Sequence, residues 1–251
     1  TVMSGSTPIV HVSNPSGIKQ IFSNTKEITD SGIFFRDSNL TRVKQGILQI
    51  DGLVHKHRRP LLMKVYQGER MKANGQRICQ LTKKIISQQG IGKTFTAYDI
   101  VLEIILQVAI EVVIGLREGE RYEKIKHLFT SLIKCEQSLL FDLVVKEFSF
   151  VQDLGRWSSA GYRNYLYKEI LQFLYDEVQE RRKQADYSRN DMLSELITAC
   201  DETGKPLSDE EVRDLLFLPI LGSRDGPAHS YTWCLYWVHR LPNVREQLLE
   251  E

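Results

Sequence analysis

The chain has 251 residues, which is enough for one large domain or two small ones, and its 42% hydrophobic and 26% charged residues are those of an ordinary globular protein. The net charge of +1 argues against a nucleic-acid partner or an acidic membrane surface. The four cysteines form no C-x-x-C pair, which argues against a disulfide framework or a zinc site and favours a reducing, cytoplasmic setting.

The elements expected in chain order are mostly helices. Residues 8–13 (PIVHVS) predict a short strand, residues 16–22 a helix, and residues 29–54 a long loop of the kind that often carries function. Further helices are expected over 55–66, 68–89, 95–115, 119–144, 156–184, 189–200, 208–240 and 242–251. The sequence therefore predicts a mainly α fold with minor β near the N-terminus, and not a sandwich, a barrel or a doubly wound sheet.

The most apolar stretch covers residues 100–116, and it is the strongest membrane candidate. Glu103, Gln107 and Glu111 recur there every four residues, so they line one polar stripe of a helix. The stretch is therefore predicted to be a buried amphipathic helix, and no membrane span is expected.

Several helix ends carry signals of their own. The spacings Ser188 to Asp191 and Ser208 to Glu211 are those of capping boxes. The basic triplet at 181–183 is interpreted as a solvated helix end. In the last long helix, the aromatic residues at 233, 236 and 237 are interpreted as core packing.

The helix expected over 208–240 is interrupted at residues 222–227 (GSRDGP). Each glycine inside a helix costs about 1 kcal/mol and an interior proline about 3 kcal/mol. The segment is consistent with a plain kink, which glycine and proline produce without any catalysis, or with a functional opening that carries the acid Asp225.

A second candidate site lies at residues 51–59 (DGLVHKHRR). His55 and Arg59 are four residues apart, so on a helix they share a face and together can bind a carboxylate. Taken alone, such a cluster is more commonly a solvated basic helix start. Pro60 is expected to push Arg59 away from helical angles, because it lacks an N–H for the Lys56 carbonyl.

These two segments resemble the cytochrome P450 family, in particular its soluble bacterial and cyanobacterial members. Gly52, His55 and Arg59 match the G-x-x-H-x-x-x-R pattern of the family's C helix, where the His and Arg bind a haem propionate. The segment 222–228 aligns without gaps with the I-helix motif Ala-Gly-x-Asp-Thr-Thr-Ala, and the flanks at 209–216, 228–233 and 241–246 also run as in the family.

The I-helix match is incomplete at two positions. Asp225 supplies the acid, but Gly226 and Pro227 stand where the family has two threonines, the first of which orders the water network that protonates oxygen. The resemblance therefore implies Asp225 as the catalytic residue, with the two hydroxyls missing.

The resemblance implies one partial P450 domain over residues 1–251, from the short strand and B helix to the J helix. Neither the family's E-x-x-R helix nor its F-x-x-G-x-x-x-C-x-G haem loop is matched, and Cys79 fits only through Gly75. We therefore expect no metal ligand in this chain, a polypeptide that continues past Glu251, and no activity for the chain alone.

The complete protein is expected to be a haem-thiolate monooxygenase with haem b as its cofactor. The resemblance implies a lipophilic substrate, fatty-acid or terpenoid-like, that faces residues 29–54 and 141–157. It also implies electrons from a ferredoxin with its reductase or from a flavoprotein.

Two alternatives stay open. Arg224 and Pro227 favour a peroxygenase-like P450 variant, which peroxide-supported turnover without a reductase would identify. Prolines and glycines at helix-interior positions instead favour a non-catalytic, haem-less all-α remnant, which haem content would identify; these positions are Pro60, Pro219, Gly226 and Pro227.

Overall fold

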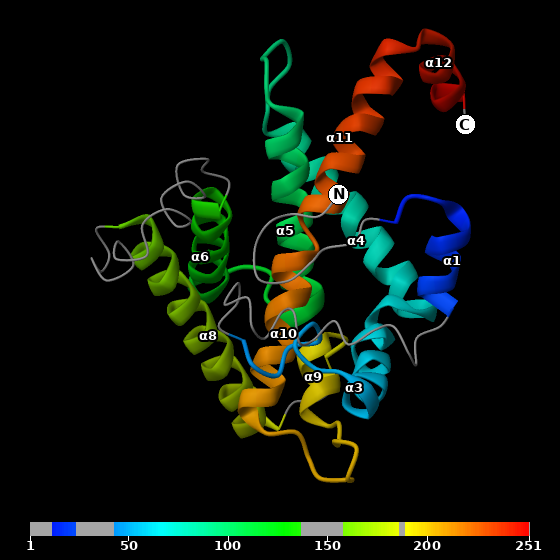
Figure 1. Cartoon of the computed structure of the whole chain (residues 1–251). Coiled ribbons are helices and arrows are strands. Elements are labelled where there is room, and N and C mark those ends of the chain that lie inside the picture. The colour runs from blue at the N-terminus through cyan, green and yellow to red at the C-terminus, as the bar shows by residue number, and fades with distance from the viewer. Residues whose placement is uncertain (1–11, 24–42, 137–157, 186–188, 251) are drawn as a thin grey trace.

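The computed structural model describes residues 12–23, 43–136, 158–185 and 189–250, and most of them lie in helices (Figure 1). The helices are α1 (Pro15–Ser23), α3 (Gly52–Met63), α4 (Gly68–Ser87), α5 (Ala97–Ile114), α6 (Glu120–Glu136), α8 (Ser159–Gln184), α9 (Met192–Ile197), α10 (Asp209–Gly222), α11 (Asp225–Arg240) and α12 (Pro242–Glu250). A short 3-10 helix, η1 (Lys64–Tyr66), follows α3.

The mainly α prediction is confirmed. Over the described ranges there is no strand, and β pairing is limited to an isolated bridge between Cys200 and Pro206. The strand expected at 8–13 falls largely outside the described residues, and the loop expected at 29–54 is described from residue 43, with residues 52–54 belonging to α3. The helix expected over 189–200 is only Met192–Ile197, with Asp191 as its N-cap, and Ser188 lies outside the described residues.

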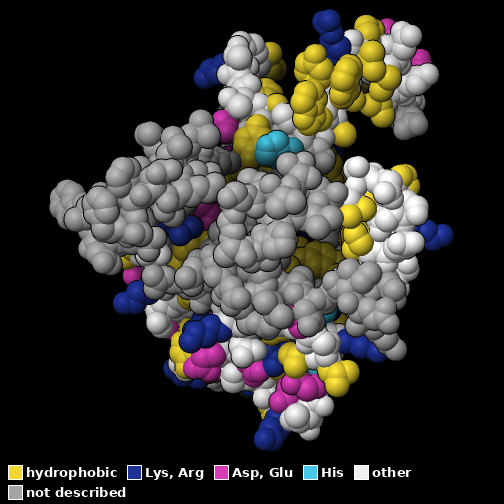
Figure 2. Space-filling model, in the orientation of Figure 1, with side chains coloured by type: hydrophobic (Ala, Val, Ile, Leu, Met, Phe, Trp, Pro, Cys, Tyr) yellow, Lys and Arg dark blue, Asp and Glu magenta, His cyan; other side chains and the backbone are white. Residues whose placement is uncertain are grey.

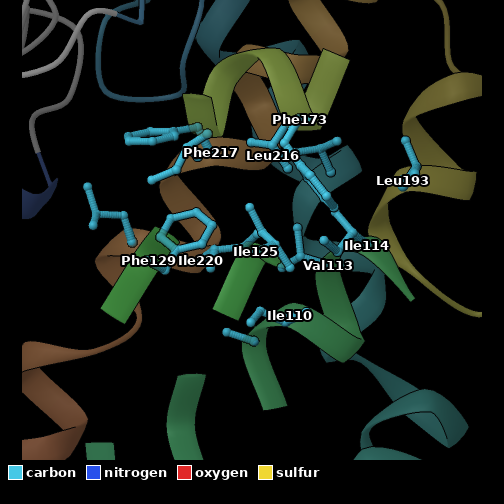
Figure 3. Packing of buried hydrophobic residues seen from close by; sticks show 14 of the residues in the cluster. Ile110, Val113, Ile114, Ile125, Phe129, Phe173, Leu193, Leu216, Phe217 and Ile220 are labelled. Atoms are coloured by element: carbon cyan, nitrogen blue, oxygen red, sulfur yellow. The ribbon is translucent and has the colours of Figure 1, made fainter. Parts of the chain in front are cut away.

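The core is built around α10, which packs against α5, α8 and α9. Phe217 of α10 is fully buried, with its ring 6.1 Å from that of Phe129 in α6 and 5.5 Å from that of Tyr167 in α8. Figure 3 shows this arrangement, with apolar side chains converging from α5, α6 and α10: Ile110, Val113, Ile114, Ile125, Phe129, Leu216, Phe217 and Ile220. Burial of such side chains is the main force that holds the helices together.

The polar stripe of α5 is used for contacts between helices. Glu111 is buried and bonds to Arg77 of α4 and to Arg117, each at 2.7 Å. Glu103 bonds to Lys126 of α6 at 2.9 Å. The amphipathic interpretation of this helix is therefore correct, and Glu103 and Glu111 are paired with cations from α4, from α6 and from the loop after α5. Among the helices of the described ranges, none is both long and apolar enough to span a membrane.

The basic triplet at 181–183 is not a solvated helix end, so that prediction was wrong. The Arg181 side chain is 3% exposed, and its guanidinium bonds to Asp191 at 2.9 Å, to Ser194 Oγ at 2.7 Å and to the Ile114 carbonyl at 3.2 Å. These bonds join the ends of α5, α8 and α9. Only the third residue, Lys183, is exposed.

The N-terminus of α10 also holds the segment that leads into α3. Ser208 and Glu211 form the predicted capping box, in which each residue's side chain accepts from the other's backbone N–H. One turn later, the buried Asp214 carboxylate accepts from the backbone N–H groups of Lys44 and Gln45 at 3.0 and 2.9 Å. The described part of the expected long loop is therefore fixed to α10.

Candidate functional site

The first candidate site lies on α3, which begins after the extended Asp51. Gly52 has φ +60°, a backbone conformation that residues with a Cβ rarely adopt, and this accounts for glycine at this position. The helix continues through Pro60, so the expected displacement of Arg59 from helical geometry does not occur. His55 and Arg59 therefore lie one turn apart on one face of α3.

The basic residues of α3 divide into two groups. His57 Nε2 lies 3.0 Å from the Cys200 carbonyl oxygen, and the buried Arg58 guanidinium bonds to Glu211 of α10. By contrast, the His55 ring and the exposed Arg59 guanidinium make no hydrogen bond or ion pair with any other residue that the structure describes. His57 and Arg58 anchor the helix, and His55 and Arg59 bond to none of the described residues.

The free pair fits a haem propionate by its donor chemistry. A histidine and an arginine on one helix face offer several N–H donors to a carboxylate, and the arginine fork can bind both oxygens. The sequence match alone did not show which basic residues of α3 anchor the helix, because the acid that pairs with Arg58 lies 153 residues away.

The surroundings of two cysteines, Cys200 and Cys135, bear on whether they could bind a metal. His57 is two residues from His55, about 200° around the helix, so its contact with Cys200 places that cysteine on the opposite side of α3. Cys135 is half-buried, and burial raises the pKa of its thiol, which disfavours the thiolate form that binds metals. Within the described ranges, no cluster of three or more His, Cys, Asp or Glu residues could hold a metal ion.

The second candidate site is the junction of α10 and α11. The interruption expected at 222–227 is a complete break, which divides the helix expected over 208–240 into two helices that meet at Ser223 and Arg224. Asp225 is the first residue of α11, and its side chain lies outside the description. A Cβ atom at Gly226 would meet nothing within 4 Å, so this position has room for a side chain.

Pro227 is the third residue of α11 and not a helix-interior residue. The first four N–H groups of a helix have no partner within it, so the missing N–H of Pro227 removes no helical bond. Gly226 and Pro227 therefore give less support to a non-catalytic remnant, because both lie in the first turn of a new helix. Pro60 and Pro219 do lie inside helices, as expected.

Arg224 has a partner that sequence reasoning missed. Its guanidinium bonds to Glu136 at the end of α6 at 2.5 Å, and the other oxygen of Glu136 accepts from the Tyr167 hydroxyl at 2.8 Å. Burial and the nearby Glu136 carboxylate raise the pKa of Tyr167 far above its usual value, so its hydroxyl stays protonated and acts as a donor. No sequence signal connects Glu136 to Arg224, which is 88 residues further along the chain.

The aromatic side chains of α11 are not core residues, so that interpretation was wrong. Trp233, Tyr236 and Trp237 are 58%, 51% and 51% exposed. Figure 2 shows hydrophobic side chains gathered over α11 and α12, which extend away from the body of the molecule in Figure 1. One face of α11, near His229, contacts Tyr98 of α5 with ring centroids 5.0 Å apart.

Comparison with known proteins points in one direction. The family model described as Cytochrome P450 matches residues 1–251. Cytochrome P450 135B1 of Mycobacterium tuberculosis is 25% identical over 237 residues, which cover 93% of this chain and 48% of that protein. Pentalenene oxygenase of Streptomyces avermitilis is 32% identical over 91 residues, which cover 35% of this chain and 20% of that protein.

Solved structures show the same fold. The retinoic acid-bound cyanobacterial CYP120A1 superposes with a TM-score of 0.65 at 16% identity, over 83% of this chain and 45% of that chain. Substrate-free CYP109E1 from Bacillus megaterium superposes with a TM-score of 0.66 at 17% identity, over 83% of this chain and 50% of that chain. The chain spans about half the length of the curated relatives that it matches over most of its length.

Proposed function

Because this chain belongs to the cytochrome P450 family, we propose that residues 1–251 form one partial P450 domain of a haem-thiolate monooxygenase. The observation that carries the proposal is the pair formed by His55 and Arg59, which share one face of α3 and bond to no other described residue, while their neighbours anchor the helix. The proposed substrate is a lipophilic small molecule, fatty-acid or terpenoid-like. The partial identity with pentalenene oxygenase supports the terpenoid side of this range.

His55 and Arg59 would hold the propionate of haem b. The Arg59 fork binds two carboxylate oxygens, and the His55 ring adds a further N–H donor on the same face. Bound through a cysteine thiolate, haem supplies the O–O cleavage chemistry of this family. None of the four cysteines of this chain has the flanks of that ligand, so the thiolate is proposed to come from outside residues 1–251.

The junction of α10 and α11 is proposed to line the part of the haem site where dioxygen would bind. Asp225 provides a carboxylate that holds and passes a proton there. Gly226 and Pro227 provide no hydroxyl, so the proton would pass through water that this chain orders less well than a threonine hydroxyl does. Electrons are proposed to come from a ferredoxin with its reductase or from a flavoprotein, in a cytoplasmic setting.

Haem titration of the complete protein, which would include the proposed thiolate ligand, tests the propionate role. His55→Ala and Arg59→Ala should each weaken haem binding, because each removes a charge-assisted bond of about 1.5–3 kcal/mol, or roughly 10- to 100-fold in affinity. Lys56→Ala is the matched control, since it removes an exposed cation from the same helix and should change nothing. Unchanged affinity in both site variants, or no haem uptake by the parent protein, would reject the proposal.

The peroxygenase-like alternative is less well supported. In that alternative Arg224 would bind a substrate carboxylate, but its guanidinium is already paired with Glu136. A haem-less remnant is the other alternative, and the titration above decides it, because a remnant would take up no haem in any variant.

A further inference from the structure

One carboxylate joins three parts of the fold at the point where α10 ends and α11 begins. Glu136 is the last described residue of α6; its Oε2 accepts from Arg224 Nη2 at 2.5 Å and its Oε1 from the Tyr167 hydroxyl of α8 at 2.8 Å. The side chains of Arg224 and Glu136 are only 10% and 19% exposed, so solvent screens their attraction weakly. We call these three residues the Glu136 cluster.

The cluster is anchored to the core on the α10 side. The Tyr167 ring packs 5.5 Å from the ring of Phe217, which lies in α10 about two turns before the junction. The Arg163 guanidinium also lies over the Tyr167 ring, 5.9 Å from its centre. The Tyr167 hydroxyl, which donates to Glu136, is therefore held in place by packing of its ring as well as by that hydrogen bond.

On the other side of the junction, Arg224 itself starts α11. Its carbonyl accepts the first backbone bond of that helix, from the N–H of the fully buried Ala228 at 2.9 Å. Gly226 is not constrained by neighbouring side chains, since a Cβ there would meet nothing within 4 Å, whereas Pro227 fixes its own φ but has no N–H to donate. The side chain of Arg224 therefore links the first turn of α11 to α6, while residues further along α11 pack against α5, as His229 does against Tyr98.

We propose that Arg224 is a positioning residue, whose ion pair with Glu136 sets the direction in which α11 leaves α10. The proposal rests on the proposed function only in that the same junction is proposed to lie where dioxygen would bind. The ion pair itself is a property of the fold, and its effect on α11 is measured without haem.

Hydrogen exchange of the chain, read by mass spectrometry at the amide of Ala228, tests this role of the Arg224–Glu136 ion pair. Removing one partner leaves the other charge buried and unpaired, so Arg224→Gln and Glu136→Gln should each speed this exchange by about tenfold. The double variant should exchange no faster than either single one, because the two changes remove the same bond. Lys134→Gln is the matched control, as an exposed cation in the same turn of α6.

A positioning role is separated from a loss of overall stability by location and by rescue. Amides of α4 and α9 should keep their parent exchange rates in all variants, and Arg224→Lys should restore most of the protection at Ala228. The proposal is overturned if Ala228 exchange is unchanged in Arg224→Gln, if the two single effects add, or if α4 and α9 accelerate equally. The haem titration of His55 and Arg59 variants reports on the proposed function separately, so either proposal can fail alone.

Discussion

Arg181 and Asp191 form an ion pair of 2.9 Å in which the two side chains are only 3% and 2% exposed. The pair lies where α5, α8 and α9 meet, and Asp191 also caps α9 by accepting from the Ser194 N–H at 2.8 Å. One carboxylate therefore satisfies both a helix end and a buried cation.

Arg181→Ala should lower the free energy of unfolding by about 3–5 kcal/mol, because it leaves the Asp191 carboxylate buried without its cation. Lys183→Ala, in the same triplet but exposed, should change it by less than about 0.5 kcal/mol. Urea unfolding followed by circular dichroism measures both. Equal effects of the two substitutions would show that the triplet is a solvated helix end after all.

Gly115→Ala should be at least as damaging. Gly115 ends α5 with φ +72°, and a Cβ there would collide with the Asp191 carboxylate that binds Arg181. We expect a loss of about 3 kcal/mol or more in the free energy of unfolding, since the collision adds to backbone strain. Gly68→Ala is the control for strain alone, because Gly68 has φ +60° with nothing within 4 Å, and it should cost about 1–2 kcal/mol.

The Glu211 carboxylate should make stability depend on pH in the acid range. Burial opposes its ionisation, but bonds from the Ser208 backbone N–H and the Arg58 guanidinium outweigh burial and hold its pKa below the usual value. A lowered folded-state pKa means that this contribution is present above the unfolded pKa, near 4.3, and is lost as the pH falls through the folded value.

The difference in unfolding free energy between the parent and Glu211→Gln should therefore be largest near pH 7 and shrink below about pH 4. The same comparison made in an Arg58→Met background should show a smaller difference at neutral pH, because the cation that lowers the pKa is gone. A difference that stays constant from pH 7 to pH 3 would contradict the assignment.

The two prolines of the interrupted helix should behave differently. Pro219 lies inside α10, where a missing N–H and a clash with the preceding turn cost up to about 3 kcal/mol, so Pro219→Ala should stabilise the chain. Pro227 lies in the first turn of α11, so Pro227→Ala should change stability by less than about 0.5 kcal/mol. Thermal unfolding compares them, and a gain for Pro227→Ala alone would place it inside a continuous helix.

Gly226→Thr combined with Pro227→Thr should improve coupling in a haem-bound form of the complete protein. The change supplies the hydroxyl and the N–H that the junction lacks, and the space around Gly226 accommodates the side chain. The expected result is more product for each equivalent of reductant and less released peroxide. No gain in a variant that still binds haem and substrate would show that the junction does not deliver protons.

Local features of this protein were predictable because they involve residues within one or two turns. The capping box of Ser208 and Glu211 follows from a spacing of three, and the stripe of Glu103, Gln107 and Glu111 follows from a spacing of four. The pairing of His55 with Arg59 on one face follows in the same way. The exact break between α10 and α11 did not, because glycine and proline permit a kink without stating where the helix restarts.

The amino-acid order alone was therefore enough to predict the mainly α class, since helix period and caps depend on contacts between near neighbours, and short motifs were enough to propose two candidate sites. The partners of the charged residues needed the folded chain. Arg58 pairs with Glu211 across 153 residues and Arg224 with Glu136 across 88, whereas Arg59, next to Arg58, pairs with no acid that the structure describes. Which arginine is an anchor and which is available to a ligand depends on how separate helices pack, and packing is a property of the whole chain that no local spacing encodes.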